Sequence, residues 1–169
     1  CKHYTEDITE FNEQLLPTKT MFPDDLLILH ASLECTNFSK AKGGKPRDAD
    51  SRTLANHLIR YIEWLNPDYI TIENVREFMA WGPLNDKGKP VSRLNGIDYM
   101  RWKQSIEDLG YRHTHRMLNS ANYGAHTSRE RYFGIFAKGD LPIAFPEATH
   151  DKHARNGLEK WKPVKEKLD

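Results

Sequence analysis

Apolar residues along the chain fall into short runs and helical repeats, which predict strands and helices in alternation. The run Leu26-Leu27-Ile28-Leu29 has the length of a parallel strand buried on both faces, although periodicity alone does not exclude a helix. Apolar residues then recur at helical spacing from Leu54 to Leu65, after a helix start at Asp50-Ser51. Asn66-Pro67 ends this helix, because a residue before proline is pushed out of the helical region.

A second apolar strand follows at 69–72 and ends in Glu73-Asn74-Val75. Residues 97–109 predict another helix, with apolar positions at Ile97, Met100 and Ile106, and Gly110 closes it. If the first two strands share a sheet, the strand-helix-strand order makes a right-handed crossover.

Two more strands are expected towards the end of the chain. Residues 111–118 alternate weakly, whereas 132–137 (YFGIFA) form a clearer strand, and a polar loop at 119–131 separates them. Residues 10–23 predict a short helix or an irregular link, limited by two prolines. The segment after Phe145 turns polar and reads as a loosely ordered or incomplete element.

Composition adds limits rather than a function. A chain of 169 residues is long enough for one domain with a real core, and its net charge of +1 implies no strong global attraction for nucleic acid. Only Cys1 and Cys35 are present, so no disulfide framework is visible and a reducing compartment is favoured. Without an apolar membrane span or signal-peptide core, the expectation is an intracellular, cytoplasmic protein.

Reactive side chains stand at the expected strand ends. Cys35 follows the first strand, Glu73 ends the second, and Arg129 and Arg131 precede the last. Taken singly, a cysteine there is a small buried hydrophobe, a glutamate is a cap, and a pair of arginines is solvated surface. The carboxyl ends of parallel strands collect ligands, so their joint occurrence predicts a shared site. The basic residues between 40 and 52 are either solvated surface or a phosphate-binding patch.

Four segments in order resemble the DNA (cytosine-5) methyltransferases. SLECTNFS resembles the family's nucleophile loop, and DSRTL the opening of the next helix. IENV matches the Glu-Asn-Val signature, and TSRERYFGIF, with NYG upstream, resembles the Gln-x-Arg-x-Arg element. The resemblance covers nearly the whole chain and implies a protein encoded by a bacterium or a phage. It implies an α/β, Rossmann-like core that depends on S-adenosylmethionine, here incomplete, with a mostly parallel sheet and flanking helices.

The resemblance also implies roles for individual residues. Cys35 would add as a thiolate to carbon 6 of a cytosine flipped out of double-stranded DNA, so that carbon 5 can accept a methyl group. Glu73 would contact ring nitrogen 3 and the amine, Arg131 the carbonyl oxygen, and Arg129 the loop or thiolate. Asp7 and Leu54 would contact the cofactor, and the nucleophile loop would contact DNA through Ser39, Lys40, Lys42 and Arg47.

Several departures from the family pattern accompany this likeness. Glu34 replaces a proline before the nucleophile, Thr36 replaces a glutamine, and Thr127 replaces the Gln of the arginine motif. The glycine-rich turn that begins the cofactor site does not occur in this chain. We therefore expect 1–145 to be the central part of a catalytic domain and 146–169 a polar tail leading towards a missing target-recognition region. The chain would be a fragment, a subunit of a split enzyme or the ordered part of something longer, completed by a second chain or by missing segments, and inactive alone.

Rival readings remain on the residues alone. Some relatives of such enzymes are catalytically inactive subunits that bind DNA or stimulate an active partner. A cysteine hydrolase could pair Cys35 with His126, and a zinc site could use His150 and His153, although no second ligand pair has metal-site spacing. Asp7, on position alone, could be a simple cap or turn residue.

Overall fold

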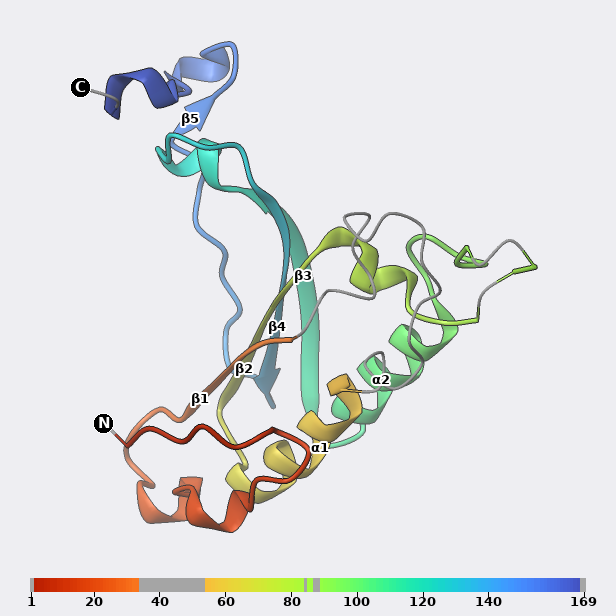
Figure 1. Cartoon of the computed structure of the whole chain (residues 1–169). Helices are drawn as coiled ribbons and strands as arrows, with labels where there is room; N and C mark the ends of the chain where they lie inside the picture. Colours follow the sequence, from red (N-terminus) through yellow and green to blue (C-terminus); the bar gives the residue numbers. More distant parts are fainter. Residues whose placement is uncertain (1, 34–53, 84, 87–88, 168–169) are drawn as a thin grey trace.

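The main element is one four-stranded mixed sheet. The computed structural model describes residues 2–33, 54–83, 85–86 and 89–167. In spatial order the strands are β1 (Ile28–Ser32), β2 (Tyr69–Asn74), β4 (Glu130–Lys138) and β3 (Tyr111–Asn119). β1 is parallel to β2, and β4 is antiparallel to both β2 and β3. Three of the four strands therefore run in one direction, with β4 inserted against them (Figure 1).

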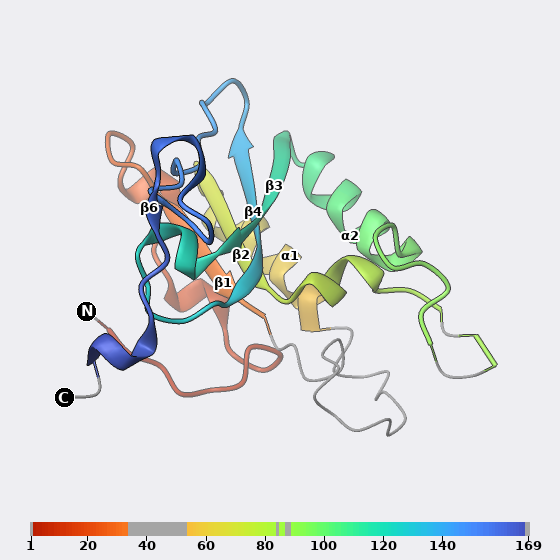
Figure 2. The same ribbon diagram turned by 90° about the horizontal axis from the view of Figure 1, so that it is seen from above.

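Two helices pack on one face of this sheet. α1 (Leu54–Leu65) and α2 (Ile97–Glu107) lie side by side there, together with the short 3-10 helix η5 (Arg76–Ala80) (Figures 1 and 2). The core between helices and sheet is rich in aromatic rings, and its fully buried members include Phe78, Trp102, Tyr132 and Phe136. These rings meet mostly edge to face, an arrangement that adds stability beyond the buried area.

Local sequence explains where the helices end. After α1, Asn66 takes a left-handed backbone conformation at φ 50° and Pro67 follows, so the helix stops where the sequence predicts. After α2, Gly110 adopts φ 90° and reverses the chain into β3. Gly96, at the start of α2, is required for packing, because a Cβ there would lie 1.9 Å from the carbonyl oxygen of Trp81.

The expectation that the first strand is buried on both faces is wrong. The first strand begins at Ile28 and is an edge of the described sheet, with Leu26 and Ile28 65% and 57% exposed. Within the described ranges, helices cover only one face of this strand, so it is not buried on both, and β2 is its only neighbour in the sheet. In α2, Ile97 and Met100 are exposed, while Tyr99, Trp102 and Ile106 form the buried stripe.

The ends of the chain form two smaller units. Residues 2–27 contain no strand: the 3-10 turns η1 (Glu13–Leu15) and η2 (Lys19–Met21) fall within the link expected at 10–23. The tail runs along the sheet away from the helices and then forms a small lobe (Figure 1). This lobe contains β5 (His150–Asp151), η7 (Arg155–Gly157), β6 (Glu159–Lys160) and η8 (Val164–Lys167).

The lobe is anchored on η6 (Ser120–Tyr123), the turn after β3. The indole Nε1 of Trp161 donates to Asn122 Oδ1 at 2.9 Å, and the backbone N–H of Thr149 donates to the Asn122 carbonyl at 2.9 Å. The tail is therefore more ordered than its polar sequence predicts. Within the described ranges, no helix has the length and apolar character needed to cross a bilayer.

Candidate active site

Glu73 and Arg131 meet on the face of the sheet opposite the helices. Arg131 Nε lies 3.3 Å from Glu73 Oε1, and both side chains are about one fifth exposed, at 23% and 21%. On the other side of the carboxylate, Ser32 Oγ donates to Glu73 Oε2 at 2.5 Å. The carboxylate is thus held between a hydroxyl and a guanidinium, which fixes its orientation at the rim of the sheet.

Strand alternation explains why Glu73 lies there. In β2, Ile70, Ile72 and Asn74 point into the helix-covered core, whereas Thr71 and Glu73 point to the other face. A slip of one residue would bury Glu73 and expose the isoleucines, so the hydrophobic pattern also sets the register of the site. The parallel pairing of Ser32 with Glu73 places the hydroxyl beside the carboxylate.

A cavity of about 450 Å³ opens beside this pair. Its polar side includes Glu73, Arg129 and Arg131, and its apolar side is formed by Leu118, Phe133, Ile135, Ala144, Phe145 and Pro146. An apolar pocket with a few convergent polar groups is the usual form of a small-molecule site. The tail segment 144–146 closes one wall, so residues from β2, β4 and the tail share the cavity.

The loop before β4 is held by η6. The backbone N–H of Ser120 donates to the Arg129 carbonyl at 3.0 Å, and the Arg129 N–H donates back to Ser120 Oγ at 3.1 Å. Arg131 lies within β4, which begins two residues earlier than the sequence indicates. These bonds bring Arg129 to the cavity wall, where Glu73 and Arg131 also lie. Their chemical roles stay predictions.

The expected cofactor residues are elsewhere. Asp7 lies in an exposed turn near the start of the chain and does not line the cavity, and Leu54 is the first residue of α1. Asp7 Oδ1 accepts from the N–H of Thr9 at 2.8 Å and from its hydroxyl at 2.7 Å. These two bonds, the backbone one first, lower the pKa of Asp7, so the carboxylate is ionised at neutral pH.

Other expected residues fall outside the described part of the chain. They are the nucleophile Cys35 and the DNA contacts Ser39, Lys40, Lys42 and Arg47. Conversely, the motifs did not indicate Ser32 as a site residue. The signal that could have found it is strand alternation, which places Ser32 on the same face as Glu73 once the two strands are paired in register.

The histidines of the rival readings have other partners. His126 Nδ1 lies 3.1 Å from the Pro163 carbonyl oxygen, which ties the tail to the loop before β4. His150 is buried, with Nδ1 2.8 Å from Thr149 Oγ1 and Nε2 3.2 Å from Glu159 Oε2. In the ranges that the structure describes, no group of three or more His, Cys, Asp or Glu side chains could hold a metal.

The chain is similar in sequence to known type II methyltransferases. The chain is 29% identical over 152 residues to the type II methyltransferase M.BspRI of Lysinibacillus sphaericus, which covers 87% of this chain and 31% of that protein. It is 28% identical over 137 residues to the type II methyltransferase M.HhaI of Haemophilus parahaemolyticus, covering 81% of this chain and 36% of that protein. The chain thus spans about a third of the length of these relatives.

Solved structures agree on the fold. The Entamoeba histolytica methyltransferase EhMeth superposes with a TM-score of 0.52 at 16% identity, covering 90% of this chain and 41% of that one. The Spodoptera frugiperda DNMT2 mutant gives 0.51 at 18% identity, covering 94% and 40%. The expected α/β methyltransferase core, with a mostly parallel sheet and flanking helices, is confirmed. A family model described as C-5 cytosine-specific DNA methylase matches residues 1–168, and the chain belongs to that family.

Proposed function

We propose that this chain forms the central part of a DNA cytosine-5 methyltransferase and that the cavity beside Glu73 receives a flipped cytosine. The observation that carries the proposal is the convergence of Glu73, Arg129 and Arg131 on one cavity of about 450 Å³. A pyrimidine ring is flat and apolar on its faces but has a polar edge. The apolar wall and the carboxyl-guanidinium rim match those two properties.

The chemistry follows from the weakness of carbon 5 as a nucleophile. Addition of the Cys35 thiolate to carbon 6 makes the ring enamine-like, and Cys35 leaves again when carbon 5 loses its proton. Glu73, as a neutral acid, donates to ring nitrogen 3 and accepts from the amine, which stabilises the charge that develops during attack. Arg131 donates to the carbonyl oxygen, and Arg129 steadies the loop or the thiolate.

Before the base enters, Glu73 is held by Ser32 and Arg131. The Ser32 hydroxyl donates a hydrogen bond to one carboxylate oxygen, and the Arg131 guanidinium forms an ion pair with the other. Entry of cytosine would move the Arg131 guanidinium towards the carbonyl oxygen of the base, which frees one carboxylate oxygen for a proton. The Glu73–Arg131 contact is then a resting arrangement that the substrate replaces.

S-adenosylmethionine, when bound, supplies the methyl group. Of the described residues, Asp7 fits a cofactor contact, because its Oδ1 is engaged by Thr9 and its Oδ2 has no partner among the residues described. An ionised carboxylate oxygen facing solvent suits the exocyclic amine of an adenine ring. Leu54, at the start of α1, is the second residue of the chain that we assign to this cofactor.

We infer that the active form is larger than this chain. The support is β1, whose outer edge and one face are not covered by any part of the chain that the structure describes, and the exposure of Leu26, just before this strand, and of Ile28 at its start. Such an edge invites pairing with further strands, either of a longer chain or of a second one. The prediction for the isolated 169-residue chain is weak cofactor binding and little or no turnover.

Two measurements on protein purified from its host under native conditions test the proposal. Methyl transfer from tritiated S-adenosylmethionine to DNA reports the reaction, and a duplex with 5-fluorocytosine traps the Cys35 adduct. We expect both signals, and a Cys35→Ser variant should lose both. Transfer without an adduct would contradict the covalent route. The absence of both signals would favour the rival role of an inactive DNA-binding or stimulating subunit.

A further inference from the structure

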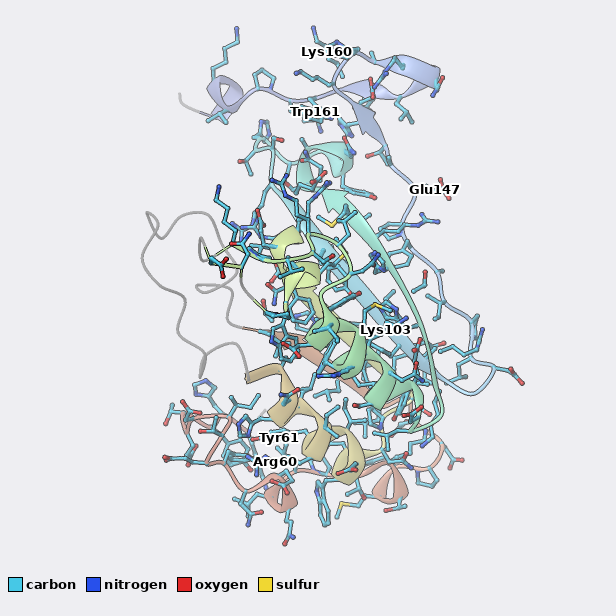
Figure 3. The ribbon with its side chains drawn as sticks, turned by 90° about the vertical axis from the view of Figure 1, so that its right-hand side faces the viewer. Arg60, Tyr61, Lys103, Glu147, Lys160 and Trp161 are labelled. Carbon is cyan, nitrogen blue, oxygen red and sulfur yellow. The ribbon has the colours of Figure 1, made fainter. Side chains whose placement is uncertain are left out.

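Arg60, on the outer side of α1, holds the segment that contains Asp7. Its Nη2 donates to the carbonyl oxygens of Ile8 at 2.7 Å and Phe11 at 2.8 Å, and its Nη1 contacts Glu13 Oε2 at 2.6 Å. The neighbouring hydroxyl of Tyr61 donates to the same Ile8 carbonyl at 2.7 Å. Figure 3 shows Arg60 and Tyr61 together beside this segment, at the end of the molecule away from Trp161.

The two carbonyls that Arg60 binds bracket a tight turn. Within it, the N–H groups of Glu10 and Phe11 both donate to the Asp7 carbonyl, at 3.0 and 2.9 Å. Thr9 donates twice to Asp7 Oδ1. The turn therefore orients the Asp7 carboxylate from inside, while Arg60 fixes the turn to the helix from outside.

Apolar packing supports the same connection. Phe11, Tyr61 and Leu65 form a small buried cluster separate from the main core, with Phe11 8% exposed. Burial raises the pKa of Tyr61, so its hydroxyl stays a neutral donor across the physiological range. The guanidinium of Arg60 also lies over the Tyr61 ring, 4.7 Å from its centroid.

We propose that Arg60 is a positioning residue for cofactor binding, because it docks the Asp7 turn on α1 and so presents Asp7 Oδ2 to the adenine amine. This inference rests on the cofactor role that the proposed function gives Asp7. An ion pair with Glu13 alone would need only Nη1, whereas Nη2 is used on the two carbonyls that frame the turn. Only a planar fork of donors can satisfy these acceptors together, so lysine is a partial substitute at best.

The first experiment measures the turn itself. Hydrogen exchange in the purified protein should be at least tenfold faster at the amides of Glu10 and Phe11 in Arg60→Met, and unchanged in β2 and β4. Arg60→Lys should restore part of the protection. The matched control is Arg101→Met, which removes an exposed arginine of α2 whose nearest carboxylate, that of Asp98, is 3.8 Å away. Unchanged exchange at Glu10 and Phe11 would overturn the inference.

The second experiment connects the turn to the cofactor. Titration of protein purified from its host with S-adenosylmethionine should give a dissociation constant about tenfold higher in Arg60→Met, partly recovered in Arg60→Lys, with DNA affinity unchanged. If Arg60 acts through Asp7, adding Arg60→Met to Asp7→Asn should weaken binding no further. A fully additive double variant, or faster exchange with unaltered cofactor affinity, would overturn the positioning role.

The two experiments also separate this inference from the proposed function. Wild-type protein that binds no S-adenosylmethionine at millimolar concentration would refute the cofactor role of Asp7, and the inference would fall with it. Normal cofactor binding in both wild type and Arg60→Met would leave the methyltransferase proposal intact and refute only the role of Arg60.

Discussion

The two faces of the sheet differ in what covers them and in what their residues do. One face lies under α1 and α2 and is filled by interlocking aromatic rings, including those of Phe78, Trp102 and Tyr132. The other carries a carboxylate, two arginines and a half-apolar cavity, and the part of the chain that the structure describes crosses it with the tail segment. The same strands serve both faces, because alternate residues of β2 and β4 point in opposite directions.

This contrast separates stability from chemistry. Residues on the helix side should control the free energy of unfolding and leave the reaction untouched when the fold survives. Residues on the cavity side should do the reverse, since they make few buried contacts. Substitutions in the two sets therefore test the assignment of each face.

The largest effect is expected on the helix side, at Trp102. This side chain is 2% exposed, and its Nε1 donates to the Ala55 carbonyl at 2.9 Å. Trp102→Ala should lower the free energy of unfolding by about 4 kcal/mol, because a large cavity is left and the Ala55 carbonyl loses the indole donor. Trp102→Phe keeps most of the ring volume and should lose less. Denaturant unfolding measures both, and a loss below about 1 kcal/mol in Trp102→Ala would contradict the packing described.

Glu73→Gln should give the next largest effect, this time on activity. The amide keeps the size of the side chain but cannot act as an acid towards ring nitrogen 3, so methyl transfer should fall about 10³-fold. Stability should change by less than about 1 kcal/mol. Glu130→Gln is the matched control, because Glu130 pairs with Arg76 at an exposed position of β4. Equal activity in the two variants would remove Glu73 from the reaction.

The pH dependence of stability tests the burial of His113 on the helix side of the sheet. Burial, followed by the charges of His115 and Lys103, lowers the pKa of His113 from 6.5 to about 3. The unfolded chain therefore takes up the proton more readily between these values. The stability linked to His113 is complete above pH 6.5 and falls as the pH drops towards 3, by about 1 kcal/mol per unit.

Thermal unfolding from pH 7 to 4 measures this dependence. His113→Gln should flatten the decline, because the amide cannot gain a proton and its oxygen can still accept from the Tyr132 hydroxyl, now 3.0 Å from His113 Nε2. His153→Gln, at an exposed position in the tail lobe, is the control and should keep the wild-type slope. Parallel curves for His113→Gln and wild type would contradict the burial of this ring.

The smallest effect should come from Ser32. Ser32→Ala removes one donor from the Glu73 carboxylate at a partly exposed site, which is worth about 1 kcal/mol, or a fivefold loss of methyl transfer. Ser32→Thr retains the hydroxyl and should retain the activity. Steady-state rates of the two variants decide whether the hydroxyl orients Glu73 or is incidental.

Sequence patterns predicted the positions of helices and strands better than they predicted which residues of those elements are buried. The helix at 54–65 and the strand after it are recognisable, because Pro67 and the periodic apolar residues are local signals. The exposure of Ile28 could not be read locally, since it depends on which strands and helices lie beside β1. Likewise, Tyr99 and Trp102 are buried in α2. Their burial depends on the space that the core offers to their rings, which the hydrophobicity of each residue alone does not predict.

The site was partly predictable for the same reason. Glu73, Arg129 and Arg131 belong to motifs whose places at strand ends imply convergence, and they do converge. Ser32 and the wall formed by Phe145 depend on pairing and on the path of the tail, which no single segment encodes. The role of Arg60 could not be predicted from one segment either, because its partners lie about fifty positions earlier in the chain.

The position of β4 has a consequence for how the molecule is assembled. It lies between β2 and β3 although it comes after both in the sequence. β2 and β3 are therefore joined in one sheet only when Glu130–Lys138 pairs with both of them. Of the described sheet, a nascent chain that ends before β4 contains the paired strands β1 and β2 and an unpaired β3. The four described strands therefore cannot form one sheet until residue 138 has been translated, and a truncation just before position 130 should yield aggregates rather than a smaller stable protein.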